Sequence, residues 1–208
     1  MADAPNDLIA ISMKTLAHYE QSAESFWYGT EHHDVSQNIE ALCSRLVGRP
    51  PRVILDLGCG PGRDLVKFRA LGFEVVGLDG CAAFCRMARA HAGCEVLHQD
   101  FLALDLPAGR FDGIFANASL FHVPRSALPR VLGELRESLK PGGVLFASNP
   151  RGADQEGWSS GRYGSFHSLE AWRAYTAAAG FTELDHYYRP AGRPRAEQPW
   201  LATVLQRA

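Results

Sequence analysis

The chain has 208 residues, of which 46% are hydrophobic and 21% charged, a composition typical of one globular domain. Its formal net charge is −2, so no overall basic field attracts nucleic acid or an anionic membrane surface. No apolar run approaches the roughly 20 residues that cross a bilayer, and the N-terminus lacks the pattern of a signal peptide. We therefore expect a single cytoplasmic domain that recognises its partner locally.

The first two thirds of the chain alternate between strand-like and helix-like segments. A helix is predicted over 34–48, with Asp34 as its N-cap. From residue 52, apolar runs without clean alternation indicate strands buried on both faces, and amphipathic stretches separate them. The predicted strands are 52–57, 73–79, 94–100, 111–117 and 142–148, and the predicted helices are 63–71, 81–92 and 126–139. This order predicts right-handed βαβ units and a parallel sheet.

The last third predicts a different arrangement. "LKPGG" at 139–143 ends the third helix, and the long segment 149–167 is expected to be a loop that acts as a lid. A helix over 168–180 precedes two strand-like runs, 181–190 and 198–207, joined by the loop 189–199. The expected fold is α/β: a doubly wound, mostly parallel, Rossmann-like sheet of about seven strands, with helices on both faces and an antiparallel C-terminal hairpin.

Three glycines follow the first predicted strand in "ILDLGCGPGRD", residues 54–64. The first βα turn of such a sheet is a common ligand site, and glycine lets a ligand lie against the main chain. A dinucleotide site needs G-x-G-x-x-G, but here Gly62 comes one residue early and Arg63 takes the required place. Asp56 would repel phosphate and attract a cation. The pattern therefore predicts a positively charged ligand.

These residues resemble the class I S-adenosylmethionine (SAM)-dependent methyltransferases, especially their small single-domain members of type 11/25. "DLGCGPG" matches the first motif of that family, and the resemblance continues through "VVGLD", "HQDF", "FDGIFANASLFHV" and "LKPGGVLFAS". It implies an enzyme that uses SAM and releases S-adenosylhomocysteine. The chain, 1–208, is then one domain with an N-terminal helical lid (1–48), a SAM-binding core (52–148) and a substrate-facing part (149–208).

The resemblance also implies roles for single residues. Asp56 and the first glycines would line the methionine part of SAM, Asp79 would accept hydrogen bonds from the ribose, and Asp100 would accept one from the adenine amino group. Asn117 would lie near the transferable methyl. The implied cofactor site comprises Asp56, Gly58, Cys59, Gly60, Gly62, Arg63, Asp79, Gly80, Asp100, Phe101 and Asn117.

The methyl acceptor is expected above the ends of the fourth and fifth strands. Arginines in the surrounding loops suit capture of a carboxylate or phosphate, so we expect a small anionic metabolite methylated on O, N or S. The candidate substrate residues are Trp27, Arg151, Trp158, Arg162, Tyr163, Tyr188 and Arg195. His122 and His33 are candidate general bases. For each arginine and histidine, the alternative is a solvated, paired or packed side chain.

Two alternatives stay open at this stage. An RNA or protein methyltransferase is one, although the near-neutral charge and "NASL" after the fourth strand count against nucleic acid. A SAM-binding regulatory domain without turnover is another. No metal is expected, because Cys81, Cys85, His91 and Cys94 complete no known zinc framework and suit reduced, buried thiols better. The acceptor and the oligomeric state cannot be predicted.

Overall fold

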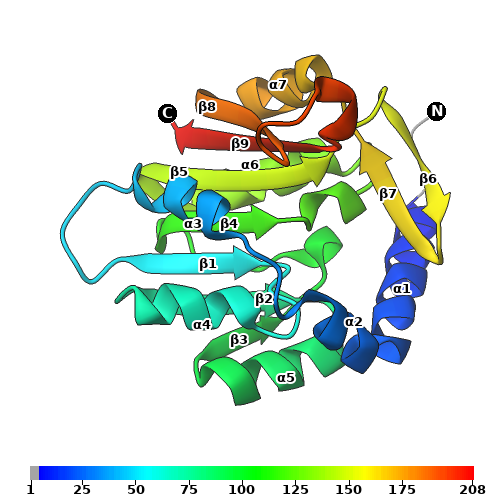
Figure 1. Ribbon diagram of the computed structural model, residues 1–208, viewed down its shortest axis with the longest axis horizontal. Helices are drawn as coiled ribbons and strands as arrows, with labels where there is room; N and C mark the ends of the chain where they lie inside the picture. The colour runs from blue at the N-terminus through cyan, green and yellow to red at the C-terminus, as the bar shows by residue number, and fades with distance from the viewer. Residues whose placement is uncertain (1–4) are drawn as a thin grey trace.

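A seven-stranded sheet runs through the centre of the protein, whose residues 5–208 are described by the computed structural model (Figure 1). Its strand order is β3-β2-β1-β4-β5-β9-β8. The first five strands pair in parallel, and β9 is antiparallel to both β5 and β8. The strands are β1 (Val53–Leu57), β2 (Glu74–Asp79), β3 (Glu95–His98), β4 (Phe111–Asn117), β5 (Leu139–Pro150), β8 (Phe181–Arg189) and β9 (Trp200–Arg207). The predicted fold class is confirmed.

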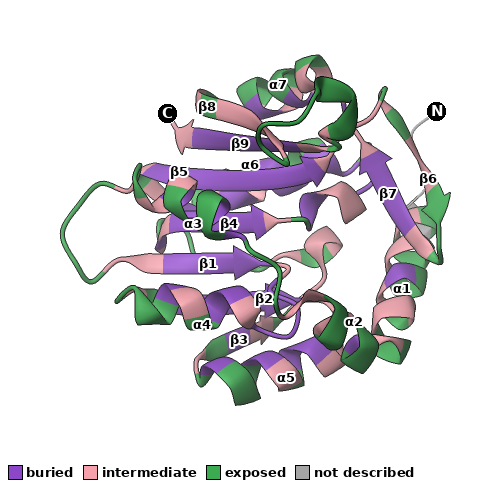
Figure 2. Cartoon of the chain, viewed as in Figure 1, coloured by how far each residue is buried: buried purple, intermediate pink, exposed green. Residues whose placement is uncertain are grey.

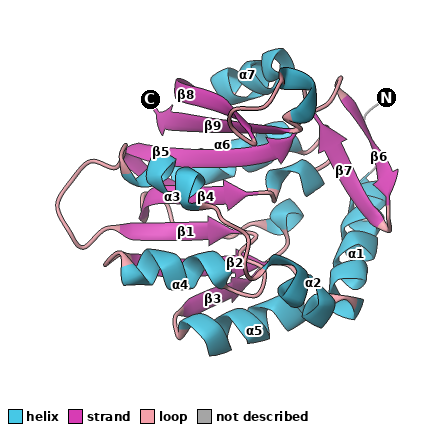
Figure 3. Cartoon of the chain, viewed as in Figure 1, coloured by secondary structure: helices cyan, strands magenta, loops and turns pink. Residues whose placement is uncertain are grey.

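Helices cover both faces of this sheet (Figure 3). On one face, α3 (Ser36–Cys43), α4 (Arg63–Ala70) and α5 (Ala82–Ala92) pack in a single apolar cluster with strand residues such as Phe115. On the other face, α6 (Leu128–Ser138) and α7 (Leu169–Ala178) pack in a second cluster. Because both faces are covered, the central strands are buried along most of their length (Figure 2), which explains their predominantly apolar sequences.

Two N-terminal helices stand at the edge of the sheet toward which the parallel strands point (Figure 1). They are α1 (Pro5–Gln21) and α2 (Ala23–Thr30), which meet at a short break after Gln21. Residues 5–208 also contain three short 3-10 helices: η1 (Phe101–Ala103), η2 (Leu120–His122) and η3 (Arg195–Glu197). In the sequence, only α3 lies between α2 and β1. In the structure, α1 and α2 lie at the carboxyl ends of the parallel strands (Figure 1).

The expected loop over 149–167 is wrong, because most of this segment is strand. β5 continues to Pro150, and β6 (Gln155–Ser159) pairs antiparallel with β7 (Arg162–Phe166) in a separate hairpin. A tight turn with positive φ at Ser160 (49°) and Gly161 (80°) connects the two strands, the backbone geometry that two-residue hairpins need. This hairpin lies beside α1 (Figure 1).

The boundaries of two other predicted elements also differ. The helix expected over 34–48 spans only Ser36–Cys43, and Asp34 supports its start by accepting hydrogen bonds from the Ser36 N–H and hydroxyl at 2.9 and 2.6 Å. β5 begins at Leu139 rather than after the "LKPGG" turn, because Leu139 pairs with Phe111 before a register shift in β4.

Within residues 5–208, no helix has both the length and the apolar character needed to cross a membrane. All five cysteines are free thiols, and Cys59, Cys81 and Cys85 are buried. Burial raises the pKa of Cys81 to about 12 and that of Cys85 to about 11, so both thiols stay protonated at neutral pH.

Candidate functional site

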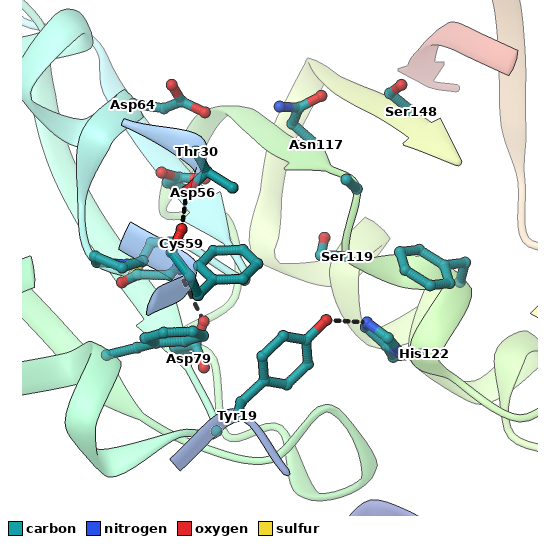
Figure 4. A pocket seen from close by; sticks show the side chains of 18 of the residues that line it. Tyr19, Thr30, Asp56, Cys59, Asp64, Asp79, Asn117, Ser119, His122 and Ser148 are labelled. Carbon is teal, nitrogen blue, oxygen red and sulfur yellow. Dashed lines mark hydrogen bonds between the residues drawn. The ribbon is translucent and has the colours of Figure 1, made fainter. Parts of the chain in front are cut away.

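A cavity of about 660 Å³ opens at the carboxyl ends of β1, β2, β4 and β5, with α1 and α2 forming part of its wall (Figure 4). This is the edge at which open α/β sheets bind ligands. The cavity brings together these residues of the expected cofactor site: Asp56, Gly58, Cys59, Gly60, Arg63, Asp79, Gly80, Asp100, Phe101 and Asn117.

The main chain of the glycine turn is held by β2. The Gly58 N–H donates to the Leu78 carbonyl at 2.7 Å, and the Gly60 N–H donates to Asp79 Oδ2 at 2.9 Å. Gly58 has φ +76°, and a Cβ added to it would lie 2.5 Å from Ser119 Cβ. Position 58 therefore requires glycine both for its backbone conformation and for the close approach of the segment after β4.

Gly62 has a different role from the one expected, since it does not line the cavity. It is the N-cap of α4 with φ +96°, and a Cβ there would lie 2.8 Å from the Ala88 Cα of α5. The third glycine thus permits two helices to pack closely and does not line this cavity.

Asp56 presents an unpartnered oxygen to the cavity. The residue is 3% exposed, and its Oδ2 atom has no hydrogen-bond partner among the described residues. Burial raises the pKa of Asp56 well above its ordinary value, and the nearby charge of Asp64 adds to this. A buried carboxylate oxygen without a partner is costly. A cationic ligand would supply the missing partner, so Asp56 fits the positively charged amino acid end of SAM.

Arg63 is held by two elements at the start of α4. Its guanidinium forms two hydrogen bonds of 2.7 Å with the Asp64 carboxylate and a third, of 2.8 Å, with the Thr30 carbonyl of α2. Such bidentate pairs fix geometry as well as charge. Arg63 therefore fastens the end of α2 to the rim of the cavity and compensates the charge of Asp64.

Asp79 ends β2, Asp100 lies two residues after β3, and both line the cavity. Asp79 accepts hydrogen bonds from the N–H groups of Gly60 and Cys81, yet burial outweighs them and raises the pKa of Asp79 to about 6. Asp100 accepts from the Leu102 N–H at 2.8 Å and from the Ser12 hydroxyl of α1 at 2.5 Å. Asp100, the residue expected to bind the adenine amino group, therefore also binds α1 to the core through Ser12.

The opposite wall carries a chain of hydrogen bonds that joins α1, η2 and β7, and Figure 4 shows its central bond, between Tyr19 and His122. The Tyr19 hydroxyl lies 2.8 Å from His122 Nε2, and His122 Nδ1 lies 2.6 Å from the Tyr163 carbonyl oxygen. Arg162 Nη1 donates to the Tyr19 oxygen at 3.3 Å. Burial lowers the pKa of His122 to about 4. Both ring nitrogens of this candidate base are thus already engaged.

Asn117 is oriented from behind by residues that sequence reasoning did not single out. Its Oδ1 accepts from the Nδ2 of buried Asn38 at 2.9 Å, and Asn38 Oδ1 accepts from the Tyr187 hydroxyl at 2.9 Å. Because the oxygen of Asn117 is engaged in this way, its amide N–H group is the part left for a ligand.

Of the expected substrate residues, the structure brings Arg162 and Trp27 to the cavity wall, together with the candidate base His33. His33 is exposed. Trp27 packs on the His91 ring with centroids 4.4 Å apart, and His91 in turn contacts the Pro61 carbonyl of the glycine turn through Nδ1 at 2.8 Å.

The other five expected substrate side chains do not line the cavity. Trp158 is 44% exposed and lies under Lys14 of α1, and Tyr163 is buried on β7, where its carbonyl receives His122. The remaining three form their own cluster beside the cavity: the Arg195 guanidinium stacks on the Tyr188 ring, and Arg151 donates to the Arg195 carbonyl at 2.6 Å. The side chains of Arg151, Tyr188 and Arg195 therefore contact one another or the main chain and do not line the cavity.

Several cavity residues were missed, and some carried a usable signal. Ser12, Leu16 and Tyr19 all face the cavity from α1, and with Thr15 they follow the i, i+3, i+4, i+7 spacing of one helix face. That pattern in "SMKTLAHY" could have identified the wall. Ser119 and Phe84 had no comparable signal in the sequence.

No group of three or more His, Cys, Asp or Glu side chains that could hold a metal ion occurs in the described part of the chain.

Comparison with known proteins agrees with this geometry. A family model described as a methyltransferase domain matches residues 54–143. The chain is 35% identical over 175 residues to the demethylmenaquinone methyltransferase of Thermus thermophilus, covering 64% of this chain and 76% of that protein. It is 41% identical over 105 residues to the trans-aconitate 2-methyltransferase of Azoarcus sp., covering 49% of this chain and 40% of the relative.

The chain spans about two fifths of the length of several curated relatives that it matches. Among solved structures, it resembles the 1,6-didemethyltoxoflavin-N1-methyltransferase of Burkholderia thailandensis, with a TM-score of 0.77, 22% identity, and coverage of 99% of this chain and 91% of that one. At that identity the likeness concerns the fold.

Proposed function

Because the chain belongs to the class I SAM-dependent methyltransferases, whose cofactor is SAM, we propose that it transfers the SAM methyl group to a small, carboxylate-bearing metabolite. One observation carries this proposal: the same cavity holds an unpartnered carboxyl oxygen on Asp56, which a cationic ligand would hold in its ionised form, and, on its far wall, the Arg162 guanidinium, which forms no ion pair with a carboxylate of the described residues. A cationic cofactor and an anionic acceptor complement these two charges.

When bound, SAM supplies a methyl group already activated by its sulfonium, so the protein need not activate a leaving group. The chain's own residues bind and orient. Asp56 would hold the charged amino acid end, Asp79 the ribose, and Asp100 the adenine edge. The α1 and α2 helices narrow access to the cavity and limit the entry of water. Positioning of this kind can lower a transfer barrier by roughly 7–11 kcal/mol.

Arg162 is the arginine best suited to capture an anion. Of the three described arginines on the cavity wall, Arg63 is paired with Asp64, and Arg189 donates to the Asp34 carbonyl at 3.0 Å. Arg162 donates only to the neutral Tyr19 hydroxyl. An acid acceptor also has support from relatives, which include enzymes acting on trans-aconitate and on malonyl-[acyl-carrier protein].

The proposal is tested by measuring release of S-adenosylhomocysteine from SAM with a panel of small mono-, di- and tricarboxylic acids, trans-aconitate included. We expect turnover with at least one acid. In Arg162→Gln, the KM for that acid should rise at least tenfold while the Kd for SAM is unchanged, because the variant loses the charged partner of the carboxylate. Arg195→Gln, outside the cavity, is the control.

Two results would count against the proposal. SAM binding without transfer to any compound would favour a regulatory domain that has lost turnover. If Arg162→Gln transfers the methyl group as efficiently as the wild type, Arg162 does not bind the carboxylate of the acceptor.

A further inference from the structure

The hydrogen bonds on the acceptor side of the cavity have a definite direction. A backbone carbonyl only accepts, so His122 Nδ1 must carry the hydrogen that meets the Tyr163 oxygen. In the neutral ring Nε2 is then an acceptor, and the Tyr19 hydroxyl must donate to it. Arg162 donates to Tyr19. Every hydrogen in this chain therefore points from Arg162 toward the Tyr163 carbonyl, where the chain ends.

Because the hydrogen bonds run in this direction, the Tyr19–His122 pair cannot act as a general base. To accept a proton from a substrate, Tyr19 would have to pass its own proton to His122, which would create a buried imidazolium beside the Arg162 cation. Burial lowers the pKa of His122 to about 4, and the charge of Arg162 acts in the same direction. Burial also raises the pKa of Tyr19 above its ordinary value. His122 instead holds Tyr19, and Tyr19 holds the Arg162 guanidinium.

The other titratable groups on the described cavity wall do not replace this base. Asp56, Asp79 and Asp100 line the cofactor half, where Asp79 and Asp100 already accept hydrogen bonds from the protein. Asp64 accepts hydrogen bonds from two of the three guanidinium nitrogens of Arg63. His33 and Asp34 are exposed at the mouth. The enclosed acceptor half thus offers a fixed cation and hydrogen-bond donors, but no group poised to remove a proton.

From this arrangement, and resting on the proposed function, we infer that the acceptor atom is a carboxylate oxygen and that the product is a methyl ester. A carboxylate is ionised at neutral pH and needs no base. The new bond joins its oxygen to the methyl carbon, the bond between that carbon and the sulfonium sulfur breaks, and the electron pair of that bond goes to sulfur. No proton is transferred. The acceptor loses its negative charge in the step, so its attraction to Arg162 weakens and favours release.

The test uses SAM labelled in its methyl group and the acid identified by the panel. After the reaction, the product is treated with mild alkali, which hydrolyses a methyl ester and releases the label as volatile methanol. We expect nearly all of the transferred label to become volatile. A methyl group on nitrogen, on sulfur or in an ether would stay with the product, and that result would overturn the inference while leaving the proposed function intact. Failure of every acid in the panel would instead reject the proposed function.

A second measurement tests the positioning role of His122 directly. Under saturating SAM and acceptor, kcat should be constant between pH 6.5 and 8.5. In His122→Asn, kcat should fall less than tenfold while the KM for the acid rises, because the Arg162 guanidinium is held less firmly. His122→Gln should restore part of the KM if its amide reaches the Tyr19 hydroxyl. An ionisation in the wild-type kcat profile that disappears in either His122 variant or in His33→Asn would establish a base and overturn the inference.

Discussion

Asp79 is the residue whose charge state should govern the pH dependence of cofactor binding. Its pKa of about 6 in the free protein lies above the ordinary value of 3.8. Ribose hydroxyls donate to the ionised form, so bound SAM lowers this pKa, and affinity falls when protons compete below pH 6. The α-amino group of SAM, with an ordinary pKa near 8, stays charged over this range.

We therefore expect the Kd for SAM to rise by up to about tenfold per pH unit below 6 because of the proton on Asp79, as measured by calorimetry. Burial also raises the pKa of Asp56, so its ionisation by the charged end of SAM adds a separate pH dependence. Asp79→Asn should bind SAM more weakly at pH 7 and lose the part of the pH dependence below pH 6 that Asp79 contributes. A wild-type Kd that does not change down to pH 5 would exclude Asp79 as a cofactor ligand.

A substitution at Gly62 measures how much the third glycine contributes to the packing of α4 against α5. Gly62→Ala places a Cβ 2.8 Å from the Ala88 backbone in addition to forcing a side chain into positive φ, whereas Gly72→Ala has positive φ (+87°) but open space. The backbone strain alone costs about 1–3 kcal/mol. In urea unfolding, Gly62→Ala should lose more stability than Gly72→Ala. Equal losses would mean that α4 and α5 adjust without cost.

At the scale of elements, α1 should open more readily when its hydrogen bond to the core is removed. Ser12→Ala deletes the donor to Asp100, and hydrogen bonds to charged groups contribute about 1.5–3 kcal/mol. Amide hydrogen exchange in residues 5–21 should accelerate by roughly tenfold or more. Ser25→Ala, which removes only the local bond to the Ser22 carbonyl, is the matched control. Unchanged exchange in Ser12→Ala would show that other contacts hold α1.

The parallel sheet could be predicted because each of its strands is a short apolar segment of the sequence and the same pattern recurs from strand to strand. Ile54 and Leu55 are both fully buried, on opposite faces, so the strand appears in the sequence as an apolar run. The β6–β7 hairpin could not be recognised because its strands are short, include glycine and small polar residues, and are partly exposed. Its pairing depends on a tight turn and on contact with α1, which the sequence does not encode as a periodic pattern.

The same difference separates the two halves of the site. The cofactor half follows from motifs within residues 56–117, because each successive strand end delivers a carboxylate to one edge of the sheet. The acceptor half depends on pairs such as Tyr19 and His122, which are 103 positions apart. Composition directed attention to the loop arginines, but only the fold distinguishes Arg162, on the cavity wall, from Arg151 and Arg195, which belong to the neighbouring cluster.

At the scale of the whole molecule, the cavity joins residues from α1, both halves of the sheet and β7. We therefore expect SAM to stabilise the protein as one cooperative unit. At a SAM concentration about 100 times the Kd, binding adds about 2.7 kcal/mol, which should raise the Tm by roughly 5–10 °C for a chain of this size. Asp79→Asn should lose most of this shift at the same SAM concentration. Two separate transitions in the calorimetric scan, only one of them shifted by SAM, would contradict this expectation.

The position of β9 has a consequence for how the chain reaches this state in a cell. β9 lies between β5 and β8, yet the ribosome makes it after both of them. Until residues 200–207 leave the exit tunnel, β5 exposes an apolar edge and β8 has no neighbour on which to dock, a condition that promotes aggregation. Nascent chains that lack residues 200–207 should therefore depend on chaperones, and the sheet closes only after its interior strand has been made and inserted.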